Sequence, residues 1–207
     1  MVDRKAETRS RILQNAARLF RRYGYEGIGI DEIMAAAGLT RGGFYAHFRS
    51  KQELFHAALA DEPEAFTPLR ADRARSRADA VSAGRALIDF YLGDGDRARV
   101  AASCPLVSLS PDVARASDGA RAAYTARVHE LVTELARCIP GDADDVRVRA
   151  LAILALCIGG AAMAHAVGDE PLAAALLDAC RARALATVAE SAVPRTASRV
   201  DGARDTQ

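Results

Sequence analysis

Tryptophan is absent from this 207-residue chain, and aromatic residues make up only 5% of it. Runs of β-branched residues with alternating polarity, the pattern of half-buried strands, are also missing. Half of the residues are nevertheless hydrophobic, and many of these are alanine, the strongest helix former. The sequence therefore predicts an all-α protein.

The sequence lacks the residue patterns of several common types of site. The four cysteines are Cys104, Cys138, Cys157 and Cys180, and they form no CxxC pair, so neither a zinc site nor a disulfide framework is expected. The first charged residue is Asp3, and no apolar stretch follows it, whereas a signal peptide contains one. We therefore expect a cytoplasmic protein without metal or cofactor.

The motifs of common enzyme classes are missing as well. The chain has no Walker loop, no GxSxG elbow and no HExxH pair. Its four histidines fall on different predicted helices, with no nucleophile or metal partner near them in sequence. These histidines are His47, His56, His129 and His165. We expect that the protein is not an enzyme.

Charge is unevenly distributed along the chain. Residues 1–60 carry ten basic and six acidic side chains, a net charge of +4, and the remainder carries −3. A basic first segment fits a polyanionic partner, although a random scatter of surface charge gives the same counts. Residues 150–167 are uncharged over 18 positions, near the length of a membrane span. Because they are rich in alanine and glycine and stand alone, we expect a helix buried on both sides in a soluble core or dimer.

Apolar residues at three- and four-residue spacing predict most of the helices. The predicted helices are 7–23, 30–37, 41–48, one that follows Ser50, 79–92, 121–138, 143–167 and 171–190. The prolines at 63 and 68 mark 61–78 as a connector, and glycines and prolines break up 93–120. The predicted domains are 1–60 and 61–190, followed by a disordered tail, 191–207.

The first domain contains the pattern of a helix-turn-helix. Gly38 ends the second helix, and Thr40 is suited to begin the third as its N-cap. Ser50 and Glu53 have the spacing of a capping box for a fourth helix. Two short helices joined by a glycine turn, next to a basic segment, indicate DNA binding.

The third helix has one apolar and one polar face. Phe44 and Phe48 face the core, and two glycines lie between Arg41 and Phe44 at a cost of about 1 kcal/mol each relative to alanine. Close approach of the backbone to a DNA groove is a reason to accept that cost, with Arg41 placed to bind guanine and its polar neighbours to bind phosphates. The alternative is a surface helix with an exposed tyrosine and histidine. The DNA-binding residues predicted here are Thr40, Arg41, Gly42, Gly43, Tyr45, His47 and Lys51.

Residues 8–59 closely resemble the DNA-binding domain of the TetR/AcrR family. The resemblance lies in Phe20 with Gly24-Tyr25, Asp31-Glu32-Ile33, Ala37-Gly38, and Tyr45-Ala46-His47-Phe48 followed by Lys51. The chain departs from the family at Ile28-Gly29, where a serine or threonine is usual, and at Gly43. We expect the backbone N–H of Gly29 to serve as a phosphate contact instead.

The resemblance implies a TetR-like all-α fold, with a three-helix DNA-binding domain and a helical domain for ligand binding and dimerisation. It implies a homodimeric repressor that binds a near-palindromic operator and is released by an unknown small-molecule effector. The last two helices of each subunit would form a four-helix interface, although the same residues could be buried within the monomer. The dimer residues predicted here are Leu151, Leu154, Ala155, Ile158, Gly159, Ala162, Leu172 and Leu176.

By the same resemblance, the effector site lies inside the second domain. Core packing is the alternative role of each candidate, and an exposed Cys104 in a loop would offer a second alternative, a regulator that senses oxidants or electrophiles by its thiol. From another class, a helical ligand carrier or scaffold without DNA binding also fits the composition. The effector-site candidates are Phe90, Tyr91, Cys104, Leu106, Val107, Tyr124, Met163 and His165.

Overall fold

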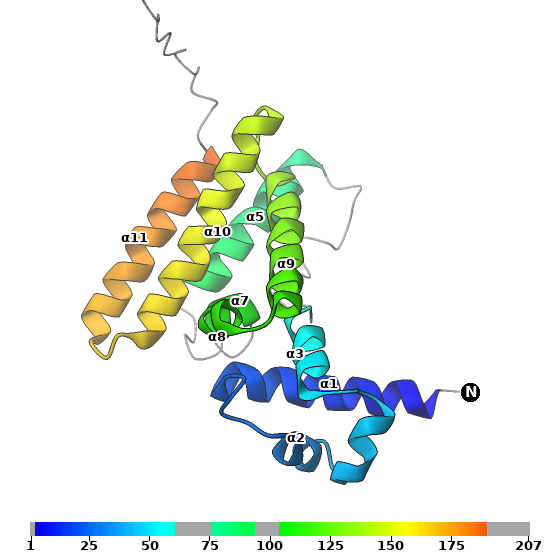
Figure 1. Cartoon of the computed structure of the whole chain (residues 1–207). Helices are drawn as coiled ribbons and strands as arrows, with labels where there is room; N and C mark the ends of the chain where they lie inside the picture. The colour runs from blue at the N-terminus through cyan, green and yellow to red at the C-terminus, as the bar shows by residue number, and fades with distance from the viewer. Residues whose placement is uncertain (1–2, 61–75, 94–103, 190–207) are drawn as a thin grey trace, which may run out of the picture.

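All regular structure in the described part of the chain is helical, as predicted (Figure 1). The computed structural model describes residues 3–60, 76–93 and 104–189. Most of the predicted connector and the whole predicted tail lie outside these residues.

The N-terminal domain, hereafter the head, consists of three α-helices and one 3-10 helix. These are α1 (Arg4–Tyr23), α2 (Ile30–Ala36), the 3-10 helix η1 (Arg41–Ala46) and α3 (Lys51–Leu59). The carboxylate of Asp3 caps α1 by accepting a hydrogen bond from the N–H of Lys5 at 2.9 Å. Ser50 caps α3 as predicted, because its Oγ accepts from the N–H of Glu53 at 3.1 Å.

The second domain, hereafter the body, is a bundle of longer helices with two short ones at its lower end. Its helices are α5 (Arg77–Leu92), α7 (Pro105–Ser108), α8 (Ser110–Arg115), α9 (Asp118–Ala136), α10 (Ala143–Ala166) and α11 (Glu170–Ala189). In Figure 1, α10 and α11 run side by side, and α7 and α8 lie between the bundle and the head. The bounds of the long helices agree with the predicted ones to within three residues, because the helical spacing of apolar residues shows where each of these helices begins and ends.

Two hydrophobic cores hold these domains. The head core gathers the buried faces of α1, α2, η1 and α3, and it also includes Leu109, Val113 and Ala120 from the body. The body core gathers α5, α7, α9, α10 and α11. Tyr124 of α9 packs against both cores. The head is therefore completed by residues far from it in sequence.

A buried arginine ties together the far end of the body. The guanidinium of Arg149 on α10 donates to the carbonyl oxygens of Thr187 at 2.9 Å and Val188 at 3.0 Å, in the last turn of α11. It also donates to the carbonyl oxygen of Pro140 and to the carboxylate of Asp145, both at 2.7 Å. Carbonyls at a helix C-terminus lack partners within the helix, so Arg149 supplies the donors that α11 needs there.

Candidate nucleic-acid interface

The turn between α2 and η1 is set by Gly38. Its φ of +67° lies in the left-handed region that favours glycine. The N–H of Gly38 donates to the carbonyl of Ala35, and that of Leu39 donates to the carbonyl of Met34, each at 2.9 Å. Leu39 then packs against the head core. These contacts fix the direction in which η1 leaves α2.

The third helix differs from its prediction. Residues 41–46 form a 3-10 helix, and the predicted α-helix over 41–48 is wrong in type and in its end. Thr40 is the N-cap residue of this helix, as predicted, but its side chain makes no capping hydrogen bond. Two glycines in a six-residue segment weaken α-helix formation, and the tighter 3-10 turn is common in such short pieces.

The two faces of η1 are separated as predicted. Phe44 and Phe48 are fully buried, with exposed fractions of 0% and 1%. Tyr45 is 61% exposed, and Arg41 and Gly42 are also exposed. The aromatic side chains thus anchor η1 to the head core while its polar edge faces outward.

The two glycines of η1 are not required by the packing of the head. A Cβ added at Gly42 would have no atom within 4 Å, and one at Gly43 would lie 3.7 Å from Cε of Met34, an ordinary contact. Neither has a positive φ. The head therefore has room for larger side chains at both positions. Glycine at both is expected of a surface that another molecule approaches closely.

Arg41 is held by an exposed ion pair. Its Nη1 lies 2.6 Å from Oδ2 of Asp31, and the two side chains are 63% and 59% exposed. Pairs this exposed contribute only about 0–1 kcal/mol. The guanidinium can therefore exchange the Asp31 carboxylate for another acceptor at little cost.

Three other residues that were expected to contact DNA are less available for it than predicted, because they are partly buried or already contact other side chains. The N–H of Gly29 donates to the carboxylate of Glu32 at 3.1 Å, so the group expected to bind phosphate already has an acceptor. His47 is half-buried rather than outward, and its Nδ1 is buried without a hydrogen-bond partner. The ammonium of Lys51 lies 4.4 Å from the ring centroid of Tyr25, a cation–π contact.

In the body, the sequence candidates Tyr91 and Cys104 lie together in the core. The Tyr91 hydroxyl donates to Sγ of Cys104 at 3.0 Å, and both residues are buried. Burial raises the pKa of the Cys104 thiol and that of the Tyr91 hydroxyl. The exposure expected of Cys104 is wrong: the residue, which directly precedes α7, is fully buried, and its raised pKa disfavours the reactive thiolate.

The remaining effector candidates separate into inner and outer residues. Leu106 and Val107 are buried in the body core, and Phe90 and Tyr124 pack against it. Met163, however, is 56% exposed, and His165 is exposed too. These last two lie on the outer side of α10, so their assignment to an interior site is wrong. Helix α10 is apolar almost all round, and its pattern therefore does not show which side faces inward.

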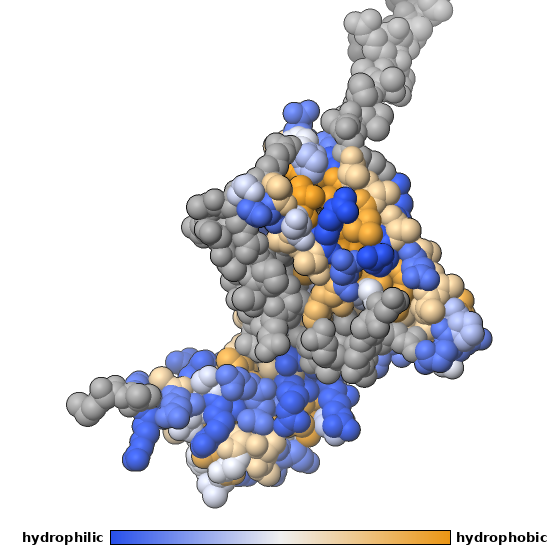
Figure 2. All heavy atoms as spheres, turned by 180° about the vertical axis from the view of Figure 1, so that it is seen from behind, coloured by the Kyte–Doolittle hydropathy of each residue, from blue (hydrophilic) through white to orange (hydrophobic). Residues whose placement is uncertain are grey.

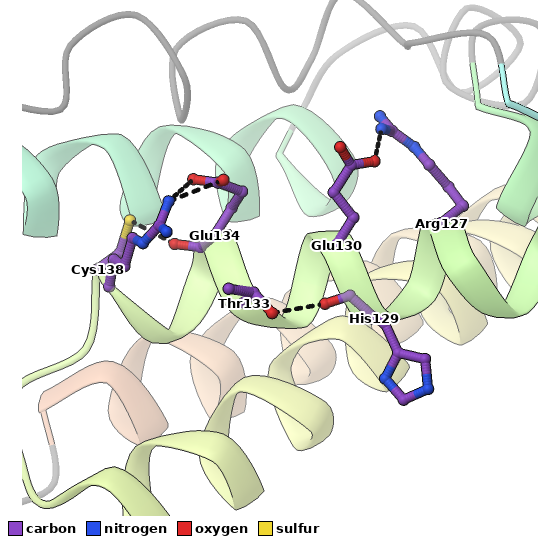
Figure 3. A network of polar contacts seen from close by, with 7 residues as sticks. Arg127, His129, Glu130, Thr133, Glu134 and Cys138 are labelled. Atoms are coloured by element: carbon purple, nitrogen blue, oxygen red, sulfur yellow. Dashed lines mark hydrogen bonds and ion pairs between the residues drawn. The ribbon is translucent and has the colours of Figure 1, made fainter.

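Sequence reasoning missed a buried cation on α9. The side chain of Arg127 is only 4% exposed, and its Nη1 lies 2.6 Å from the carboxylate of Glu130 one turn later (Figure 3). Its positive charge opposes part of the pKa increase that burial causes at Tyr91 and Cys104. The available signal was its register, since position 127 shares a helix face with the buried Leu131.

The predicted dimer residues fall into three groups. Leu151 and Leu172 are 43% and 52% exposed, and Ala155 and Gly159 are exposed, as an interface in the free chain requires. Leu154 is buried in the body core, so its predicted contact with a partner is wrong. The half-buried residues are Ile158, Ala162 and Leu176.

An apolar stripe runs along the outer face of α10. Val148 is 66% exposed, and Ala152, Ala155, Gly159 and Met163 follow it at helical spacing. All five line a groove of about 690 Å³ between α10 and α11. Only 39% of the apolar window of α10 is buried within the chain, although the helix is long and apolar enough to cross a membrane. Figure 2, seen from the other side, likewise shows apolar surface on the body and a mostly hydrophilic head.

Residues 12–58 match the family model described as "Bacterial regulatory proteins, tetR family". The HTH-type transcriptional regulator AcrR of Shigella flexneri is 49% identical over 49 residues, which cover 24% of this chain and 23% of the relative. The HTH-type transcriptional repressor AcnR of Corynebacterium glutamicum is 40% identical over 63 residues, 30% of this chain and 33% of the relative. The chain thus matches no more than a third of the length of these relatives, and the segment that the family model matches lies within the head.

The likeness of solved structures extends over both domains. A TetR transcriptional regulator from Chloroflexus aurantiacus superposes with a TM-score of 0.69 at 26% identity, covering 90% of this chain and 96% of that one. The reduced form of Escherichia coli NemR gives a TM-score of 0.68 at 20% identity, covering 90% and 100%. At that lower identity the likeness concerns the fold alone.

Proposed function

We propose that this chain is a regulator of the type described as "Bacterial regulatory proteins, tetR family", a homodimeric transcriptional repressor that is released from operator DNA by a small molecule. The observation that carries the proposal is the exposed edge of η1. Arg41, Gly42 and Tyr45 face outward from a segment that Phe44 and Phe48 fix to the head core. A rigid, thin and partly basic edge suits the major groove.

Each exposed group of this edge has a separate role on DNA. Arg41 leaves Asp31 and donates its two parallel N–H groups to O6 and N7 of a guanine. The hydroxyls of Thr40 and Tyr45 donate to phosphates and fix the position of the head along the duplex. The net charge of +4 on residues 1–60 adds a sequence-independent attraction to the phosphate backbone.

Two heads on one duplex require a dimer, and the apolar stripe of α10 supports one. Val148, Ala152, Ala155, Gly159 and Met163 leave an apolar face exposed in the single chain, and the small residues among them allow a partner helix to approach closely. Burial of this face against a second copy removes it from water. A two-fold dimer matches the two half-sites of a near-palindromic operator.

Release requires that the effector prefers a body shape that separates the heads from their half-sites. The effector site of this proposal is lined by the inner candidates around Tyr91 and Cys104, together with Arg127 of α9, whose charge acts on both side chains. Repression falls only as far as the effector's affinities for the two shapes differ. Because the DNA target lies in the cytoplasm of a bacterium, the protein acts there.

The test is binding to DNA from upstream of the protein's own gene as salt rises. We expect tight binding of two chains per duplex, with affinity falling about 10³–10⁵-fold between 50 and 200 mM salt if 6–10 phosphates are contacted. A duplex of the same length and shuffled sequence serves as the control. Equal, weak binding to both duplexes would show that the protein is not a sequence-specific regulator.

A further inference from the structure

A cluster of polar groups lies inside the hydrophobic core of the body. Three of its members act electrostatically on the fourth, the Tyr91 hydroxyl of α5, so the four side chains lie close together. None of them is more than 4% exposed. The members, hereafter the polar cluster, are Tyr91, Cys104, Arg127 of α9 and Cys157 of α10. Polar groups in a core cost free energy unless they are well paired, so packing alone does not account for this cluster.

Two donors of the polar cluster hold acceptors that another molecule can replace. The Tyr91 hydroxyl donates to Sγ of Cys104 at 3.0 Å, and a thiol is a weak acceptor. Nη1 of Arg127 lies 2.6 Å from the carboxylate of Glu130, which is 44% exposed. Figure 3 shows that Glu130 reaches Arg127 from the next turn of α9. The Glu130 side chain can therefore turn into water when a different anion takes its place.

Arg149, which is also buried in the body, is bonded in a different way. Its acceptors include the backbone carbonyls of Pro140, Thr187 and Val188, which cannot turn away. The Arg127–Glu130 pair instead joins a buried guanidinium to a side chain at the surface. Replacing a buried ion pair with apolar side chains is often neutral or stabilising. A role in stability therefore explains Arg149 well and Arg127 poorly.

The charge within the polar cluster is positive. Burial raises the pKa of the Tyr91 hydroxyl and that of the Cys104 thiol, so both groups stay neutral. The guanidinium of Arg127 remains charged at any physiological pH, and its charge acts on both of these groups. An anionic oxygen here would accept from the guanidinium and from the Tyr91 hydroxyl, and hydrogen bonds between ions are stronger than those between neutral groups.

We propose that the effector is an organic acid, an apolar molecule with one carboxylate or sulfonate group, and that Arg127 binds this group in place of Glu130. The Tyr91 hydroxyl is its second donor. The apolar part of the molecule packs against the side chains of the body core beside the polar cluster, where Leu106 and Leu131 are found. Room for the molecule opens in the body shape that the effector prefers. This inference rests on the proposed function, because it names the chemistry of that function's effector.

The test compares two dyes that differ in one group. The anionic probe is 1-anilinonaphthalene-8-sulfonate, and N-phenyl-1-naphthylamine is the same molecule without the sulfonate. Fluorescence titration of the full chain should show that the anionic dye binds about tenfold or more tightly than the neutral one. Arg127→Met should weaken binding of the anionic dye about tenfold or more and change that of the neutral dye by less than about twofold. Retained binding of the neutral dye, with an unchanged circular dichroism spectrum, shows that the variant is folded.

Three further substitutions separate recognition of an acid from a general effect of charge. Arg121→Met removes an exposed positive charge from the same helix and should leave the binding of both dyes unchanged. Arg127→Lys keeps the charge and should keep a preference for the anionic dye. Glu130→Gln removes the competing carboxylate, so it should tighten binding of the anionic dye about threefold or more and leave the neutral dye unaffected. A purely structural Arg127–Glu130 pair would not give that gain.

Titration of the upstream DNA separates failure of this inference from failure of the proposed function. A parent that binds this DNA specifically but shows no preference for the anionic dye keeps the proposed function, and the assignment of an acidic effector is then wrong. The same holds if Arg127→Met and Arg121→Met bind the anionic dye alike. If the parent binds no DNA specifically, the proposed function fails, and the effector role of an organic acid fails with it even where the dye preference depends on Arg127.

Discussion

Replacing Arg149 with methionine is expected to lower the free energy of unfolding by about 3–5 kcal/mol. Methionine fills much of the same volume but donates no hydrogen bond, so the carbonyls of Thr187, Val188 and Pro140 and the carboxylate of Asp145 lose their partner. Each buried acceptor left unpaired costs about 1–3 kcal/mol. Urea unfolding followed by circular dichroism, at a fixed protein concentration, measures the change.

Arg147 supplies the matched control for this measurement. It lies two residues earlier on α10, is exposed, and loses the same charge when replaced by methionine. Exposed substitutions usually change stability by no more than about 0.5 kcal/mol. A loss at Arg149→Met no greater than that at Arg147→Met would show that the C-terminal end of α11 does not depend on the buried guanidinium.

The largest effect on function is expected at the exposed edge of η1. Alanine at Arg41 should weaken operator binding by about 2–6 kcal/mol per dimer, because both heads carry the change and a bidentate contact with guanine is worth about 1–3 kcal/mol. Alanine at Tyr45 removes a phosphate contact from each head and should weaken binding by a similar factor for every DNA sequence. Arg41→Ala should also reduce discrimination between operator variants at one position of each half-site. Titration of labelled upstream DNA at fixed salt measures both effects.

Neither change should disturb the fold. The Arg41–Asp31 pair is exposed, and Tyr45 touches the head mainly through an edge contact with Phe44, at a centroid distance of 5.2 Å. Unfolding free energies should therefore stay within about 1 kcal/mol of the parent. Arg147→Ala removes a positive charge from the body and should leave operator affinity nearly unchanged. Equal losses at positions 41 and 147 would indicate a general charge effect rather than contact by η1.

Local sequence rules predicted much of the head. The glycine turn at Gly38, the Ser50 cap of α3 and the burial of Phe44 and Phe48 all follow from short-range geometry, and each is confirmed. The same rules failed for η1 as an α-helix, because two adjacent glycines remove the preference that distinguishes an α-turn from a 3-10 turn. The hydrogen bond from the Gly29 N–H to the Glu32 carboxylate was missed, because a nearby side chain can accept from the same N–H group that a ligand would bind.

The body was predicted in outline only. The helical spacing of its apolar residues predicts its long helices. Helix α10, however, is apolar on nearly all sides, so the elements that pack against it decide which side is buried. For this reason Leu154 was predicted at the dimer surface and Met163 in the interior effector site, whereas Leu154 is buried and Met163 is exposed. Arg127 and Arg149 were missed for a related reason. An arginine is usually exposed, and its burial depends on acceptors that lie elsewhere in the chain.

The proposed DNA binding depends on the outer edge of η1 lying close to DNA, and Gly42→Ala tests this most directly. The head has open space for the added methyl group, and alanine favours helical structure, so the unfolding free energy should be unchanged or raised by up to about 1 kcal/mol. On DNA the methyl group must displace the edge from the groove, and operator affinity should fall about tenfold or more. A Gly42→Ala protein of undiminished stability that binds the operator as tightly as the parent would contradict the account.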